Sequence, residues 1–111
     1  MGKVVTGFTM SLDGFVAAPN HDVGKLFKWY FSGDTPFPLP NTNMTFKMSA
    51  ASAKHFQSLF DTTGALVTGR GDFDASNAWA GKPPFNVPTY IVTHNPPQEW
   101  VKPDSPFTFV T

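Results

Sequence analysis

The sequence predicts an α/β fold in which short strands alternate with helices along one small domain. Four segments have the β-branched and aromatic composition of strands: residues 3–10, 65–68, 89–93 and 107–111. Two further segments, 23–31 and the stretch after Ser49, carry apolar residues at helical spacing. Helices that separate strands favour α/β layering with right-handed crossovers.

The composition is that of a globular chain. With 111 residues, 41% hydrophobic residues and 12 Phe, the sequence is long enough for a single domain, which we place at residues 1–111. The 11 Pro and 9 Gly raise the loop content without making the chain low in complexity. Because Cys is absent, disulfides, thiolate metal sites and cysteine nucleophiles are excluded.

Charge and hydropathy exclude several classes of partner. Eight basic and eight acidic residues give a formal net charge of zero, so we expect no nucleic acid partner. No apolar run approaches the roughly 20 residues that cross a bilayer, and residues 1–11 lack the layout of a signal peptide. We therefore expect a soluble cytoplasmic protein with no membrane partner.

The amino-terminal third is expected to begin with a strand. Apolar side chains occur at both even and odd positions of Lys3–Met10. Because these positions lie on opposite faces of a strand, the pattern predicts a strand buried on both faces. Asp13-Gly14 is a turn pair, and Phe15–Ala18 is expected to be a short extended return. Val23–Phe31 is expected to be a short aromatic helix that ends at Gly33-Asp34.

The middle of the chain contains the most clearly patterned helix. Thr35–Asn43 holds three prolines and is expected to be a loop. Ser49 can cap the following helix, and Gly64 is expected to end it. One apolar stripe predicts this helix: Ala53, Phe56, Leu59 and Phe60.

The remaining elements are expected to build a parallel sheet. Ala65–Thr68 is a continuous apolar run of the kind found in central parallel strands. Asp72–Trp79 is expected to form a short helix, and Thr89–Thr93 a second buried strand. Phe107–Thr111 alternates like a final strand.

The segment TGRGDFD, residues 68–74, lies in the expected βα connection. A strand that ends in Gly69-Arg70 and leads into a helix can bind a phosphate through main-chain N–H groups and the guanidinium. A plain turn is the simpler alternative. An exposed Arg70-Gly71-Asp72 adhesion tripeptide is a third, although the flanking elements hold it within the fold.

The order of segments resembles a known family. The segments are MSLDGFVA, LFKWYFSGD, GALVTGR followed by FD, and PTYIVTHNPP. They resemble the dihydrofolate reductase superfamily, in the bacterial branch that includes the reductase domain of riboflavin biosynthesis. The resemblance extends over essentially all 111 residues. It implies a mixed sheet with flanking helices and a reductase that uses NADPH on a small heterocyclic or carbonyl substrate.

The resemblance also implies the residues of a site. The catalytic candidates, which would orient substrate and nicotinamide, are Thr9, Ser11 and Asp13. A water relayed by Asp13 is the hypothesis for the proton donor. The candidates for cofactor binding are Gly14, Gly69, Arg70, Thr93, His94 and Asn95.

The sequence departs from the family pattern in two places. Gly71 and Asp72 stand where the family commonly has a basic residue and Thr, so Asp72 either faces the ligand and repels it or folds back as a helix cap. Asp74 lies four residues after Arg70 and can pair with it. Family members also continue for several dozen residues, so the chain resembles a truncated reductase.

The expected truncation leads to an alternative function. The final strand would present an unpaired edge that recruits another chain. A non-catalytic module that forms a homo-oligomer through this edge is therefore a second hypothesis, and a simple fragment is a third.

Trp29, Tyr30 and Phe31 could stack on a flat ring, but core packing is the simpler interpretation. His21, His55 and His94 have no metal-ligand spacing, so no metal site is expected.

Overall fold

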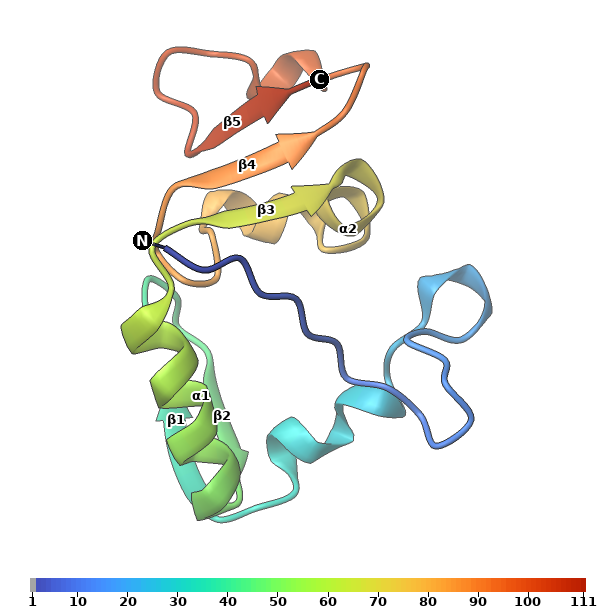
Figure 1. The fold of residues 1–111 in the computed structure, drawn as a ribbon, viewed down its shortest axis with the longest axis vertical. Coiled ribbons are helices and arrows are strands. Elements are labelled where there is room, and N and C mark those ends of the chain that lie inside the picture. The colour runs from blue at the N-terminus through green and yellow to red at the C-terminus, as the bar shows by residue number, and fades with distance from the viewer. Residues whose placement is uncertain (1) are drawn as a thin grey trace.

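The computed structural model describes residues 2–111 and confirms the α/β class. Its regular elements, in chain order, are η1 (Pro19–His21), η2 (Leu26–Phe31), β1 (Thr35–Pro38), β2 (Thr45–Met48), α1 (Ala50–Thr62), β3 (Leu66–Gly69), α2 (Arg70–Ala75), η3 (Asn77–Gly81), β4 (Thr89–Val92), η4 (Gln98–Trp100) and β5 (Phe107–Val110), where η denotes a 3₁₀ helix. The strands form two separate sheets, a β1-β2 hairpin and a three-stranded sheet in the order β3-β4-β5 (Figure 1). The expectation of one mixed sheet was therefore wrong for the described residues.

The three-stranded sheet is parallel throughout and is covered on one face. Leu66, Thr89 and Phe107 lie side by side in the register, with Thr68, Ile91 and Phe109 in the next row of that face. Behind these rows lies the first core, built from Phe73, Ala78, Ile91 and Phe107 with Trp79, Trp100 and Phe109 packed against it. Figure 1 shows α2 behind the carboxyl end of β3.

The opposite face of the same sheet is exposed and apolar. Its outward side chains include Val67, Tyr90, Val92 and Val110, which expose 70%, 36%, 46% and 37% of their surface. Parallel sheets are normally covered on both faces. The strands at 66–69 and 89–92 are thus buried on one face only, and β3 is an edge strand rather than a central one.

The β1-β2 hairpin corrects the expected loop at Thr35–Asn43. Phe37 pairs with Phe46, and Pro36 and Pro38 occupy alternate positions of β1. The main-chain N–H groups of Gly33 and Leu39 both donate toward β2 or its turn, so alternation places the proline nitrogens on the outer edge. Proline is tolerated on such an edge because no ladder hydrogen bond is lost.

Helix α1 packs on this hairpin and forms a second core. Phe37, Met48 and Ala53 are buried, and a group of partly buried side chains surrounds them: Trp29, Tyr30, Leu39, Phe46, Phe56 and Phe60. As expected, Ser49 caps α1 by accepting a hydrogen bond from the Ser52 N–H at 3.2 Å. Thr63, rather than Gly64, closes the helix by donating its N–H to the Leu59 carbonyl.

The amino-terminal segment differs most from expectation. Within the described residues, Lys3–Met10 belongs to no strand and its apolar side chains are exposed, so the prediction of a buried strand was wrong. Phe15–Ala18 is likewise no strand, but a bend that follows a turn closed by a hydrogen bond from the Ser11 N–H to the Phe15 carbonyl. A strand needs a partner for its main-chain groups, and neither segment has one in this fold.

Two expected helices are shorter and tighter than predicted. The segment 23–31 contains only the 3₁₀ helix η2, and the segment 72–79 is divided between α2 and η3. In η3 the residues Asn77–Ala80 all have φ between 47° and 53°, a left-handed turn that interrupts the right-handed helix. None of the helices in residues 2–111 is both long and apolar enough to cross a membrane.

Candidate functional site

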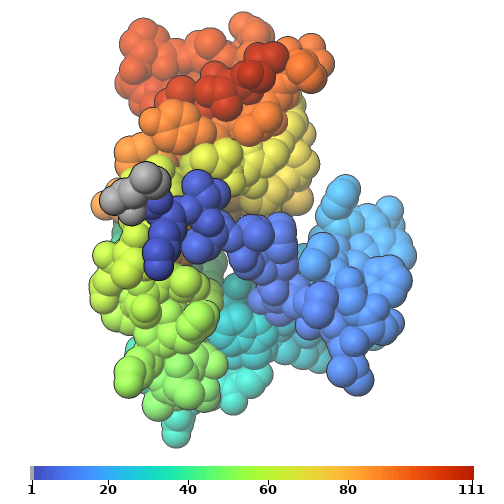
Figure 2. Space-filling view, in the orientation of Figure 1, coloured from blue at the N-terminus to red at the C-terminus, as the bar shows by residue number. Residues whose placement is uncertain are grey.

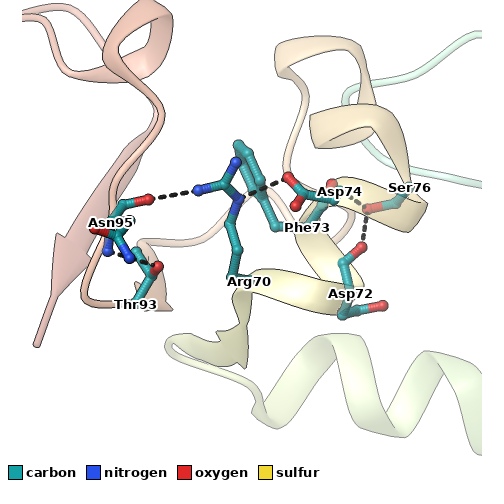
Figure 3. A network of polar contacts seen from close by, with 7 residues as sticks. All are labelled: Arg70, Asp72, Phe73, Asp74, Ser76, Thr93 and Asn95. Carbon is teal, nitrogen blue, oxygen red and sulfur yellow. Dashed lines mark hydrogen bonds and ion pairs between the residues drawn. The ribbon is translucent and has the colours of Figure 1, made fainter.

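The carboxyl ends of β3 and β4 bring together most of the expected cofactor-binding residues. Gly69 ends β3 and Arg70 begins α2, while Thr93 and Asn95 follow β4 (Figure 3). Because β3 and β4 are parallel neighbours, their carboxyl ends meet at one edge of the sheet. Ligands of open α/β sheets bind at this edge.

Arg70 connects the two loops. Its Nε donates to Asp74 Oδ1 at 2.7 Å, which confirms the expected pair between residues four apart, and its Nη1 donates to the Asn95 carbonyl. The pair is partly exposed, with 36% of the Arg70 side chain and 54% of the Asp74 side chain accessible. A guanidinium has five N–H donors, so donors remain for a further acceptor.

Asp72 folds back onto the strand that precedes it. Its Oδ2 accepts a hydrogen bond from the Thr68 hydroxyl at 2.8 Å. The residue before α2 is Gly69, which has no side chain to cap the helix. Asp72 thus neither caps the helix nor contacts Arg70, and it leaves an exposed carboxylate in the first turn of α2.

The turn after β4 is ordered by its own hydrogen bonds. The Asn95 N–H donates to Thr93 Oγ1 at 3.2 Å, and the Thr93 N–H donates to the Val110 carbonyl at 2.8 Å. His94 is exposed between them. The carbonyl that accepts from Arg70 is therefore fixed by the position of β5 as well as β4.

Ser11, Asp13 and Gly14 lie together at a second location. The Ser11 hydroxyl donates to Asp13 Oδ1 at 2.6 Å, and the Gly14 N–H donates to the Ser11 carbonyl at 3.0 Å. Gly14 has a φ of +92°, a conformation that glycine adopts without strain. A hollow of about 470 Å³ opens beside this turn, and Ser11, Asp13 and Lys25 are its polar lining residues.

Thr9 faces a different environment from Ser11 and Asp13. Its hydroxyl accepts a hydrogen bond from Trp29 Nε1 at 3.3 Å, and Thr9 does not line the hollow. Tyr30 lies beside Trp29, with ring centroids 4.2 Å apart. Burial raises the pKa of the Tyr30 hydroxyl above its ordinary value of 10.0, and the Thr9 side chain lowers it only in part.

The structure separates the two groups of candidate residues. Figures 1 and 2 show that the light-blue segment, which follows the extended amino-terminal segment, lies apart from β3 and α2. Gly14, expected to contact the cofactor, lies with this segment rather than with Arg70 and Asn95. In this conformation the expected substrate and cofactor residues do not form one pocket.

No protein-family model, curated protein or solved structure matches this chain. The geometry of the two locations is therefore the basis for a functional proposal. Within residues 2–111, no three acidic or histidine side chains gather closely enough to hold a metal ion.

Several residues of the two locations could not be found by sequence reasoning. Lys25, Phe15 and Leu26 line the hollow because the chain folds back after Gly14. The bond from Thr68 to Asp72 joins the end of β3 to the first turn of α2, so it depends on where the strand ends and the helix begins. The contact from Arg70 to Asn95 joins residues 25 positions apart, so only the tertiary structure reveals it.

Proposed function

We propose that the chain is a reductase-like, dinucleotide-binding module that receives the phosphates of NADPH at the carboxyl edge of β3 and β4. One observation carries this proposal. The residues named by the resemblance to the dihydrofolate reductase superfamily, Gly69, Arg70, Thr93 and Asn95, converge at the sheet edge where open α/β sheets bind ligands.

The donors at this edge fit a phosphate. A side chain built on Gly69 or Gly71 would meet no atom within 4 Å, so a ligand has room to approach the main chain of this turn. Arg70 is anchored through Nε and Nη1, which leaves further donors on a pre-oriented fork. Thr93 and Asn95 supply polar groups on the neighbouring turn.

The charge balance at the edge limits the affinity. Asp72 and Asp74 place two carboxylates in the same short helix as Arg70, and Asp74 is the one that pairs with the guanidinium. A carboxylate about 4–5 Å from a phosphate costs about 3–4 kcal/mol at an effective dielectric constant near 20. The hydrogen bond from Thr68 holds the Asp72 side chain against β3, and we infer that binding is weak rather than absent.

Ser11 and Asp13 are the proposed substrate-binding residues. Bound NADPH would supply a hydride for a small heterocyclic or carbonyl compound. The hollow beside Asp13 is lined mainly by apolar side chains, with Lys25 as its cation, and suits a small flat molecule. Thr9, the third candidate for orienting substrate and nicotinamide, would do so from its position beside Trp29. Catalysis would require the hollow to close toward the edge at Arg70.

Two substitutions of opposite expected effect test the nucleotide site. We expect Arg70→Ala to weaken NADPH binding about tenfold or more, and Asp72→Asn to strengthen it by about tenfold, a change of about 1.4 kcal/mol in each direction. Isothermal titration with NADPH measures both. Lys54→Ala is the control, because Lys54 is an exposed cation on α1, away from this edge.

Two results of this titration would contradict the proposal. If the three variants and the unchanged protein all have the same dissociation constant, Arg70 and Asp72 do not contact the cofactor. If no protein binds NADPH at millimolar concentration, the proposed function is wrong.

A second candidate function is a non-catalytic module that assembles with itself. The exposed apolar side chains of residues 4–10 and of the open sheet face favour this candidate, because exposed apolar patches mark protein–protein interaction sites. It predicts a stable oligomer that oxidises no NADPH in the presence of pteridines, pyrimidinones or quinones. Measurable turnover with any of these substrates would reject it.

A further inference from the structure

The segment Lys3–Met10 is extended, apolar and without a sheet partner. Val4, Val5, Phe8 and Met10 expose 102%, 79%, 75% and 61% of their surface. Within the described chain, no main-chain hydrogen bond joins this segment to another. Its main-chain donors and acceptors are therefore available to a strand, and its side chains lose contact with water when one covers them.

Strand β3 presents the complementary feature, a free edge. β3 pairs with β4 on one side, and the described chain places no strand on its other side. The Leu66 N–H donates to the Pro88 carbonyl on the β4 side at 2.9 Å. By alternation, the N–H groups of Val67 and Gly69 point toward the free edge, where they can donate hydrogen bonds to the carbonyl groups of an added strand.

The two segments have nearly the same sequence. Val4-Val5-Thr6-Gly7 and Leu66-Val67-Thr68-Gly69 share three of four residues in the same order. A parallel, in-register pair would place Val5 beside Val67, an arrangement that continues the apolar row of the open face. It would also place Gly7 beside Gly69, so that no side chain obstructs the edge near Arg70.

The chain's own segment does not reach this edge in the structure. The Trp29 Nε1 hydrogen bond to Thr9 ties the end of the segment to η2, which contacts β2 in the hairpin half of the molecule. Figure 1 shows the segment diverging from β3 as it runs toward that half. Another copy of the chain can supply the same strand without breaking this tie.

From these observations we propose that Val4–Gly7 of one copy adds as a parallel strand to the free edge of β3 in a second copy. The same contact made in both directions closes a symmetric dimer. The inference extends the second candidate function and does not depend on nucleotide binding.

Charge and area are consistent with this partner. The chain has a formal net charge of zero, so two copies carry no net repulsion. An unfolded chain exposes about 160 Å² per residue, so half-burial of the four residues Val4–Gly7 and of an equal receiving surface on β3 removes about 640 Å² per docked segment. Two reciprocal segments bury about 1,300 Å², within the roughly 1,200–2,000 Å² of specific protein–protein interfaces.

Engineered cysteines test both the partner and the register. The chain contains no Cys, so a Val5→Cys, Val67→Cys double variant carries only the two thiols of interest. Both positions are exposed, at 79% and 70%, and the substitutions are expected to leave the fold intact. Neighbouring strands are about 4.8 Å apart, which suits a disulfide. We expect oxidation without nucleotide to give a covalent dimer of twice the chain mass.

A matched control moves the first cysteine to the opposite face of the same segment. Val4→Cys with Val67→Cys places the first thiol on the opposite face, so it is expected to give far less covalent dimer than the Val5 pair. Light scattering of the unchanged protein should also give twice the chain mass at tens of micromolar.

Three results would overturn the proposal. An oxidised Val5, Val67 variant that remains monomeric with an internal disulfide would show that the chain's own segment occupies the edge. Equal cross-linking of both variants would show that association has no defined register. A monomeric mass with no disulfide in either variant would show that the edge takes no second copy. None of these results bears on NADPH binding.

Discussion

At the residue scale, Arg70 determines what the carboxyl edge of the sheet can do. Its hydrogen bonds to Asp74 and to the Asn95 carbonyl hold the guanidinium between two loops. The spacing of Arg70 and Asp74 predicts their pair, because residues four apart share a helix face. The second bond could not be predicted, since it depends on β4 lying beside β3. The fork is thus oriented by tertiary structure and not by its local sequence.

A residue-scale prediction concerns Tyr30, which lies in the hairpin core beside Trp29. Its pKa is raised by burial, so the neutral hydroxyl is favoured in the folded state. Below pH 10 the Tyr30 hydroxyl is neutral in both the folded and the unfolded state, so its contribution to the free energy of unfolding is fully present. Above pH 10 the unfolded state ionises first, so the free energy of unfolding falls as pH rises through the folded pKa.

Denaturant unfolding from pH 8 to pH 11 measures this effect. We expect Tyr30→Phe to lose stability less steeply over that range than the unchanged protein, because the variant has no hydroxyl to ionise. Lysine titration affects both proteins alike, so the difference between the two curves isolates Tyr30. Parallel curves would show that Tyr30 ionises equally in the folded and unfolded states.

At the element scale, helix α1 and strands β3, β4 and β5 were predicted from their local patterns, whereas the β1-β2 hairpin and the unpaired amino-terminal segment were not. Helix α1 has its cap at Ser49 and its apolar stripe within one segment, so the sequence alone predicts it. Strand β1 was missed because Pro36 and Pro38 suggested a loop; only the pairing with β2 shows that their nitrogens face outward. Lys3–Met10 has the composition of a strand but lacks the neighbour that a strand requires.

An element-scale prediction concerns the close approach of Gly33 to β2. A side chain on Gly33 would overlap the Met48 carbonyl group and the Ser49 nitrogen, all of them main-chain atoms that cannot move aside independently. Gly33→Ala is expected to reduce the free energy of unfolding by about 2 kcal/mol or more, since overpacking of this kind distorts the backbone.

Gly64→Ala is the control for this substitution. Gly64 follows α1, and an added side chain there would meet no atom within 4 Å. Its expected effect is within about 0.5 kcal/mol. Thermal or denaturant unfolding compares the two variants, and a Gly33→Ala protein as stable as Gly64→Ala would contradict the close packing of the hairpin.

At the scale of the whole molecule, the fold consists of two cores with apolar surface left between and beside them. One core lies behind the parallel sheet and the other between α1 and the hairpin. The space-filling view shows a gap between the light-blue segment and the sheet strands, while the dark-blue amino-terminal residues lie in front of the sheet and the α1 half (Figure 2). The exposed sheet face and the exposed residues 4–10 are the surfaces that a second copy would cover.

The expected site was only partly predictable at this scale. The segment order indicated that Gly69, Arg70 and Asn95 lie together, because the carboxyl ends of neighbouring parallel strands meet. It did not indicate that Ser11 and Asp13 lie on a separate part of the molecule. Their position depends on the amino-terminal segment, whose pairing in the sheet was predicted and is absent from the described structure.

The most direct test of the nucleotide-binding edge is an NMR titration of the ¹⁵N-labelled protein with NADPH. The proposed site predicts that the main-chain amide signals of residues 69–72 and 93–95 shift together and saturate with one dissociation constant. Signals of residues 50–62, in α1, serve as the internal control and should not move. Shifts confined to residues 11–14, or no shifts at millimolar NADPH, would contradict a phosphate site at the carboxyl edge of β3 and β4.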